Sequence, residues 1–414
     1  MAAQHGAAQT LSQALGFATG VLVVRSLDKP EYAQYSVVIA IVAAAALIAD
    51  SGINATVMSI GGALHQDKTA LAGLFARAFR VRYIFGAPII AGAGTWAAVL
   101  LIQNGATTGD CILFVAILVF TLLPTLAGGL LRVFYRLELR ARYMQAVDIG
   151  AALLRLAIVS IGLWFNIASA AYLLVGGLLV ATATVAAFAA GSKAGQMMRS
   201  TPTDNAPEFW SNIRRVLPMT VFLVISEQAL LAIASFRGDP SIVAEMSALS
   251  RFAVAFVVLN AVVSDIIAPR FARAPGDWRR LGKLVAGSFF SYLAIVVCFI
   301  SLVWAASPLL LALLGSGYSN LTLPLVLFAA GYGIANLAQA MNVIGQARGW
   351  VHWSWLYIPL SVAALLLCAF VLPLNSVTDV SVMFVVQCTP ALLTQVVRIL
   401  AGLSRARARE MNGR

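Results

Sequence analysis

The sequence is poor in charged residues, which make up 11% of its 414 positions, whereas hydrophobic residues make up 61%. A soluble globule of this size needs more polar surface than that composition provides. Histidine occurs 3 times, never in metal-ligand spacing, and the 4 cysteines form no Cys-x-x-Cys pair. The composition therefore excludes a soluble protein, and we expect neither a metal site nor redox chemistry.

Enzymatic motifs are also missing. The sequence has no Walker A motif, which argues against ATP hydrolysis by that route. The loops expected outside the cytoplasm are too short for the acidic catalytic pair of a membrane glycosyltransferase or polymerase. We therefore expect a protein that is not an enzyme and has no cofactor beyond a coupling proton or sodium ion. The N-terminus has no charged segment before an apolar run, so the first span should remain in the mature protein.

Long apolar runs dominate what is present. A helix needs about 20 mostly apolar residues to cross the ~30 Å hydrocarbon layer, and windows of that length give about twelve spans. The spans cover residues 8–24, 34–60, 83–102, 111–131, 143–165, 169–190, 216–235, 241–267, 284–306, 320–345, 352–372 and 380–400. The prediction is an all-α integral membrane protein with about twelve transmembrane helices in two six-helix lobes.

Positive charge is in excess, at a formal +12, and it lies in every second loop. Between the second and third spans, for example, the sequence has Arg77, Arg80 and Arg82, whereas the intervening loops carry only Arg25, Lys29 and Arg237. The positive-inside rule then predicts cytoplasmic N- and C-termini. We read the basic loops as topology signals that also contact anionic lipid head groups, with no role in nucleic-acid binding.

The longest polar interval lies in the middle of the chain. It predicts an N-terminal lobe at 1–190, a cytoplasmic hinge loop at 191–215 and a C-terminal lobe with a short basic tail at 216–414. A weak repeat supports two halves, since Pro30 precedes the second span as Pro240 precedes the eighth. Two lobes of equal orientation are typical of a transporter whose site lies between them.

Ionisable residues within spans are costly and usually face a cavity, so they are the candidate site. Arg155, Glu227 and Arg251 lie deepest. The two arginines come from opposite lobes and suit an anionic group such as a diphosphate. Glu227 would bind a coupling proton or cation, or neutralise one of the arginines. For these three residues a cavity role competes with a purely structural ion pair. Secondary candidates are Arg25, in a loop, and Asp50 and Asp148, which lie close enough to span ends for snorkelling to explain them.

Two segments carry a family resemblance. They are residues 25–35 (RSLDKPEYAQY) and residues 50–55 (DSGINA), with later landmarks at Pro218, at 249–251 and at 313–318. They resemble the R-x-L…(Y/F)-(G/A)-x-Y and D-x-G-(L/I)-x-x-A pattern of Wzx-type polysaccharide flippases in the multidrug/oligosaccharidyl-lipid/polysaccharide (MOP) exporter superfamily. Departures from the pattern are Ala33, Glu227 and Met246, where glycine, aspartate and tyrosine are commoner.

The resemblance implies a flippase that moves an undecaprenyl-diphosphate-linked oligosaccharide between leaflets by alternating access, for O-antigen, capsule or exopolysaccharide synthesis. Its partners would be the lipid-linked oligosaccharide, membrane lipids and other glycan-assembly proteins. Two alternatives stay open. A drug/cation antiporter of the same superfamily should have mainly acidic residues at depth, and a non-transporting scaffold of a glycan synthesis complex would not need the polar face of residues 8–24.

Overall fold

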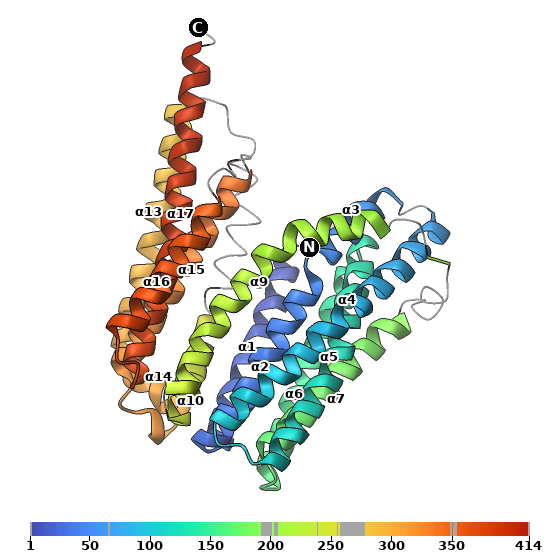
Figure 1. Ribbon diagram of the computed structural model, residues 1–414, viewed down its shortest axis with the longest axis vertical. Helices are drawn as coiled ribbons and strands as arrows, with labels where there is room; N and C mark the ends of the chain where they lie inside the picture. Colours follow the sequence, from blue (N-terminus) through green and yellow to red (C-terminus); the bar gives the residue numbers. More distant parts are fainter. Residues whose placement is uncertain are drawn as a thin grey trace. The chain divides into compact units, whose positions relative to one another are not determined.

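Helices make up all the regular structure in the described part of the chain (Figure 1). The computed structural model describes residues 2–64, 67–191, 201–202, 206–237, 239–254, 256, 278–347, 350 and 354–412. Within these ranges, 9 helices are long and apolar enough to cross a membrane. They are α2 (Lys29–Asp50), α4 (Lys68–Gln103), α5 (Thr108–Leu137), α6 (Ala141–Trp164), α7 (Ala170–Gly191), α9 (Ala206–Arg237), α13 (Trp278–Ala305), α15 (Thr322–Ala347) and α17 (Val377–Asn412). The predicted all-helical membrane fold is confirmed.

The remaining predicted spans correspond to other elements. The first lies in α1 (Ala2–Ser26), and most of the eleventh lies in α16 (Tyr357–Val371), a shorter apolar helix. The eighth begins in α10 (Pro240–Leu249) and continues into the 3-10 helix η1 (Ser250–Ala253), after which most of it lies outside the described residues.

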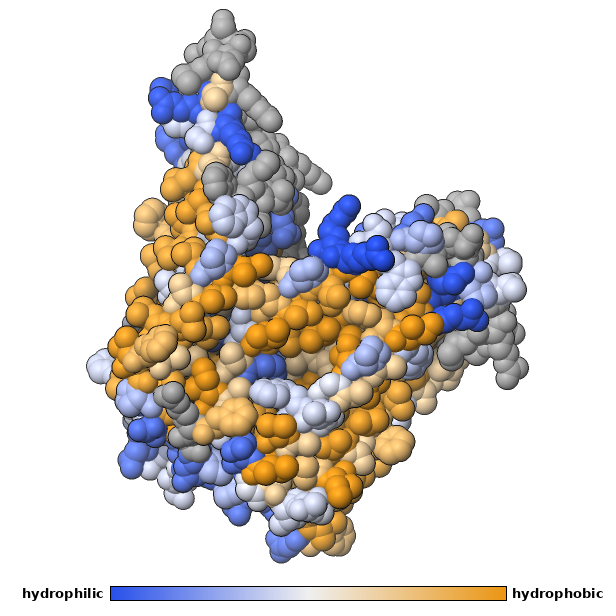
Figure 2. Space-filling model, viewed as in Figure 1, coloured by the Kyte–Doolittle hydropathy of each residue, from blue (hydrophilic) through white to orange (hydrophobic). Residues whose placement is uncertain are grey.

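Large hydrophobic side chains are exposed along these helices, among them Ile102, Phe120 and Trp164. Figure 2 shows hydrophobic side chains over the middle of the first unit's visible surface and hydrophilic ones toward its ends. This distribution fits a bundle whose middle faces lipid and whose ends face water.

The chain divides into two compact units, Met1–Ala244 and Glu245–Arg414. In the first unit α9 packs against α2, α3 (Ile53–Ala63) and α4. Its N-terminal turns insert Phe209 and Ile213 into the core formed by Phe75, Phe134 and Tyr135. Because α9 begins at Ala206, the last part of the predicted loop 191–215 is helical, which corrects that expectation. The assignment of α9 to a C-terminal lobe stays a prediction.

Two predicted spans differ clearly from the helices that contain them. The span at 34–60 is broken, because α2 ends at Asp50 and the chain turns through Ser51 (φ 29°) and Gly52 (φ 87°) before α3 begins. Glycine adopts this left-handed conformation without steric cost. The helix that contains the third predicted span, α4, begins at Lys68 rather than at residue 83. Asp67 caps it by accepting hydrogen bonds from the amides of Thr69 and Ala70.

The second unit is organised around α15, which packs against α13 and α17. Its core includes Tyr292, Leu337 and Ile344. Arg398 of α17 is buried there and donates hydrogen bonds to the Trp350 carbonyl and to Asn342 Oδ1. The short elements of this unit are α14 (Ser307–Leu314), η3 (Ser316–Tyr318) and η4 (Ser354–Leu356).

Candidate functional site

Arg155 lies in the middle of α6 with a half-buried side chain. Its Nη2 donates a hydrogen bond to Tyr35 Oη of α2 at 3.2 Å. Tyr35 is almost fully buried. Within the described residues no carboxylate forms an ion pair with Arg155. The charge of this guanidinium is therefore not neutralised by a neighbouring acid in that part of the chain.

Asp148 lies two turns earlier on α6 and is neutralised from a different helix. Arg132 of α5 donates to both carboxylate oxygens, with Nη1–Oδ2 at 2.9 Å and Nη2–Oδ1 at 2.7 Å. The guanidinium also lies 5.6 Å from the Phe188 ring centroid of α7. A bidentate pair of this kind is strong and geometrically specific. Asp148 thus joins α5 to α6, and its carboxylate is already occupied by Arg132.

Asp50 lies at the break between α2 and α3 and pairs with Arg82 of α4. Arg82 Nη2 lies 3.3 Å from Asp50 Oδ1, and Arg82 Nη1 donates to Asn54 Oδ1 at 2.9 Å. The guanidinium rests against Gly129 of α5, where a Cβ atom would come within 3.1 Å of it. The Asp50 carboxylate also accepts from the Asn54 amide. This cluster fixes the angle between α2 and α3 and is neutral overall.

These three arginines therefore differ in how their charge is balanced. Arg82 and Arg132 each have a carboxylate partner, whereas the described partner of Arg155 is the neutral phenol of Tyr35. An uncompensated cation in a membrane span is costly unless an anion or water reaches it. Of these three arginines, Arg155 is the best candidate for binding a negative group.

The segment that positions Tyr35 is residues 25–35. The Asp28 side chain accepts from the Glu31 amide and caps α2, so the helix starts with Tyr35 directed into the core. The neighbouring Gln34 donates to the carbonyl of Asn104, whose side-chain amide donates to Ser235 Oγ at 2.9 Å. These buried groups tie α2, the end of α4 and α9 together.

The other predicted residues are spread over the fold. Glu227 has an exposed side chain on α9 and no ion pair within the described residues. Arg25 is exposed in the last turn of α1. Arg251 is half-buried in η1 of the second unit, so its predicted place beside Arg155 stays a prediction.

Sequence analysis missed Arg82, Arg132 and Tyr35 as partners. Arg82 had a readable signal, because it continues the helical spacing of the apolar residues Leu71, Leu74, Phe75 and Ala78 and so shares their buried face. Tyr35 had no sequence signal beyond its place in the segment 25–35, since a tyrosine within a membrane span is commonly a packing residue. The described residues contain no group of three or more His, Cys, Asp or Glu that could hold a metal ion.

Comparison with known proteins gives a fold match and no sequence match. No model of a known protein family matches the chain, and no curated protein matches it. Among solved structures, the lipid II flippase MurJ in an inward closed conformation aligns with a TM-score of 0.72 at 11% identity, over 98% of this chain and 91% of that one.

Two further structures are of transporters. An inward-facing multidrug resistance transporter of the MATE family, in the MOP superfamily, aligns with a TM-score of 0.67 at 14% identity, over 97% of this chain and 96% of that one. A MOP superfamily transporter from Pyrococcus furiosus aligns with a TM-score of 0.61 at 13% identity, over 98% and 94% of the two chains. The chain therefore has the fold seen in MOP superfamily transporters.

Proposed function

We propose that this protein is a flippase that moves an undecaprenyl-diphosphate-linked oligosaccharide across a bacterial inner membrane by alternating access. The observation that carries the proposal is Arg155, a half-buried guanidinium in a membrane span with no carboxylate partner among the described residues. A diphosphate is the part of such a substrate that an arginine recognises well. The shared fold with a lipid II flippase supports a lipid-linked substrate.

Tyr35 is the positioning residue for this site. Its hydroxyl accepts from Arg155 Nη2 and holds the guanidinium without cancelling its charge. In the proposed mechanism the diphosphate binds Arg155, the sugar head group crosses with it, and the prenyl tail stays in lipid. The pairing of Arg251 with Arg155 in one anion site stays a prediction from the sequence.

Glu227 is the proposed coupling residue. It is an acid in the α9 span without an ion-pair partner among the described residues, so it is free to exchange a proton or sodium ion. The same feature favours the second candidate function, a drug/cation antiporter. Arg155 argues against that candidate, because an uncompensated cation repels a cationic drug.

Genetic complementation tests the proposal. The chain is expressed in a bacterial strain that lacks its own glycan flippase but retains the matching glycan pathway. Surface glycan and accumulated lipid-linked precursor are then measured together. A flippase restores surface glycan and lowers the precursor. If the protein reaches the membrane and neither quantity changes, the flippase proposal is wrong, and a test for drug export then separates an antiporter from a scaffold.

A further inference from the structure

Basic residues gather where α13 begins and α17 ends, within the second unit (Figure 1). The guanidinium carbon of Arg407 on α17 lies 5.2 Å from the centroid of the Trp278 ring on α13, and that of Arg279 lies 5.6 Å from the same ring. Residues 277–283 and 404–410 together hold six basic residues and two acidic ones. This end of the second unit is therefore a positively charged cluster, built from two helices that are far apart in the sequence.

An apolar groove lies between α13, α15 and α17 and has a volume of about 270 Å³. Among the described residues, its lining consists of apolar side chains and Gly282. Phe290 of α13 and Leu400 of α17 line it and are 64% and 60% exposed, so the groove opens at the surface of the described second unit. Both residues lie in membrane-length apolar helices, where exposed apolar side chains suit contact with lipid. The α13/α17 groove is therefore suited to an acyl chain.

The positive cluster continues the helix faces that line this groove. One face of each helix carries both kinds of residue, at the spacing i, i+4, i+7 and i+11, and residues at this spacing share a helix face. On α13 these residues are Arg279, Lys283, Ala286 and Phe290. On α17 they are Val396, Leu400, Leu403 and Arg407. The basic side chains on these faces therefore lie at the end of the groove, beyond its apolar lining.

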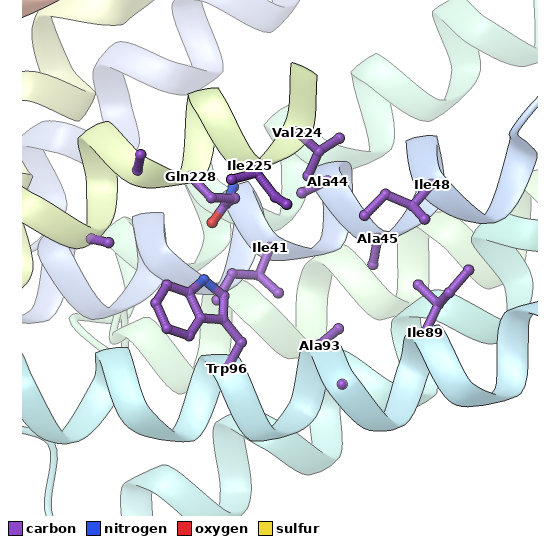
Figure 3. A pocket seen from close by; sticks show the side chains of 13 residues that line it. Ile41, Ala44, Ala45, Ile48, Ile89, Ala93, Trp96, Val224, Ile225 and Gln228 are labelled. Atoms are coloured by element: carbon purple, nitrogen blue, oxygen red, sulfur yellow. The ribbon is translucent and has the colours of Figure 1, made fainter. Parts of the chain in front are cut away.

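A topology signal alone does not require this arrangement. Basic residues that only fix the orientation of a span can extend from any side of a helix end. The larger pocket between α2, α4 and α9, of about 480 Å³, shows the contrast, because none of the residues that line it is charged (Figure 3). The described lining of that pocket selects no head group, whereas the charge at the end of the α13/α17 groove selects an anion.

Charge and groove together decide between possible occupants. A neutral lipid would fill the groove without balancing the positive cluster, and a small soluble anion would balance the cluster without covering the apolar lining. An anionic phospholipid does both, because its phosphate oxygens accept charge-assisted hydrogen bonds from arginine and lysine while its chains remain in an apolar environment. Trp278 at the same level is typical of the membrane interface, where lipid head groups lie.

We propose that the α13/α17 groove binds an anionic glycerophospholipid. Its phosphate contacts Arg279, Lys283 and Arg407, and one of its acyl chains lies against Phe290 and Leu400. The bound lipid joins the start of α13 to the end of α17. The site lies wholly within the second unit, so it is separate from the diphosphate site proposed on α6 and does not depend on the flippase proposal.

Photolabelling tests the proposal. The full chain in detergent is labelled with a phosphatidylglycerol that carries a diazirine in one acyl chain, and labelled peptides are identified by mass spectrometry. Phosphatidylglycerol and phosphatidylcholine with the same chains serve as competitors that differ in net charge, and glycerol phosphate supplies the anion without chains. We expect labels within residues 282–290 and 396–403, and displacement by phosphatidylglycerol at a concentration at least about tenfold lower than by phosphatidylcholine. Glycerol phosphate should not displace the label.

Two matched pairs of variants make the test specific. Arg407→Gln should weaken phosphatidylglycerol binding about fivefold, whereas Arg280→Gln, which removes an equally exposed charge beside the groove face, should change it less than about twofold. A Cβ atom at Gly282 or at Gly287 would meet no atom within 4 Å, but only Gly282 lines the groove. Gly282→Leu should therefore reduce labelling about tenfold, and Gly287→Leu should not.

Three results would overturn the proposal. Equal displacement by the two phospholipids would show that the groove takes bilayer chains without regard to charge. Equal weakening in Arg407→Gln and Arg280→Gln would show a diffuse attraction with no site. Displacement by glycerol phosphate at the same concentration as by phosphatidylglycerol would show an anion site that does not use the groove. These comparisons decide the matter even if Gly282→Leu does not fold.

Discussion

Asp50 at the end of α2 and Arg82 within α4 form an ion pair, with Oδ1 and Nη2 3.3 Å apart. The Arg82 side chain is 4% exposed and the Asp50 side chain 27% exposed. Removing one member of a buried pair leaves an uncompensated charge, which typically costs about 3–5 kcal/mol. The pair therefore holds the break between α2 and α3 against α4.

A double-mutant cycle tests this pair. Arg82→Met should lower the apparent melting temperature of the purified protein strongly, because the carboxylate loses its partner. Adding Asp50→Asn should recover part of the loss, with a coupling of about 1–3 kcal/mol. Arg80→Met on the exposed face of the same helix is the matched control and should have little effect. Additive effects of Asp50→Asn and Arg82→Met would contradict the pairing.

The backbone turn beside this pair makes a separate prediction. Gly52 has φ 87°, and a Cβ atom there would lie 3.2 Å from the Val216 side chain of α9. Gly52→Ala should therefore destabilise the protein by about 1–2 kcal/mol through its left-handed backbone, with the close contact adding to this. Gly62→Ala, within α3 and facing open space, is the control and should be neutral or stabilising by about 0.5–1 kcal/mol. Equal melting temperatures for the two variants would refute the strain argument.

The buried contact between Asn104 and Ser235 makes a third prediction. Ser235→Ala removes the acceptor at 2.9 Å and leaves a buried amide hydrogen unpaired. The expected cost is about 1–3 kcal/mol, together with faster hydrogen exchange at the C-terminal turns of α9. Thr220→Val is the control on the same helix, since its exposed hydroxyl bonds only to the local Val216 carbonyl. Unchanged exchange in Ser235→Ala would show that this contact does not hold α9.

Ion coupling makes a fourth prediction. Glu227→Gln removes the ionisable group on α9 and keeps its size and polarity. Transport by this variant should be slower and should no longer respond to a proton or sodium gradient. Glu208→Gln, in the first turn of α9, is the control and should keep the response of the unsubstituted chain. A full gradient response in Glu227→Gln would assign coupling to another residue.

The sequence predicted the class of fold because hydropathy depends on composition alone, and membrane-length apolar runs leave few alternatives. The sequence did not predict the helix limits where a helix extends beyond its apolar run. The predicted loop residue Arg82 lies inside α4, and residues 206–215 of the predicted hinge belong to α9. A hydropathy window ends at the first group of charges, whereas a helix ends where its backbone hydrogen bonds end.

The sequence predicted that Arg155 lies deep within a span, but it did not predict which arginines form ion pairs. Arg155 lies within α6 as expected, and seven residues separate it from Asp148 on the same helix. Which arginine would be neutralised depends on contacts between α2, α4, α5 and α6, and no local spacing encodes those contacts. The finding that Arg155 has no carboxylate partner among the described residues therefore required the structure.

The most direct test of the central claim is translocation by the purified protein in liposomes. A lipid-linked oligosaccharide is placed in both leaflets, and the fraction that becomes accessible to an added glycosidase is followed over time. We predict rapid exposure of the inner pool by the unsubstituted chain. Arg155→Met should be at least about tenfold slower, corresponding to loss of one charge-assisted contact. Tyr35→Phe should give an intermediate rate, and Arg140→Met, at an exposed surface pair with Glu138, should give a normal one. A normal rate in folded Arg155→Met would contradict the account.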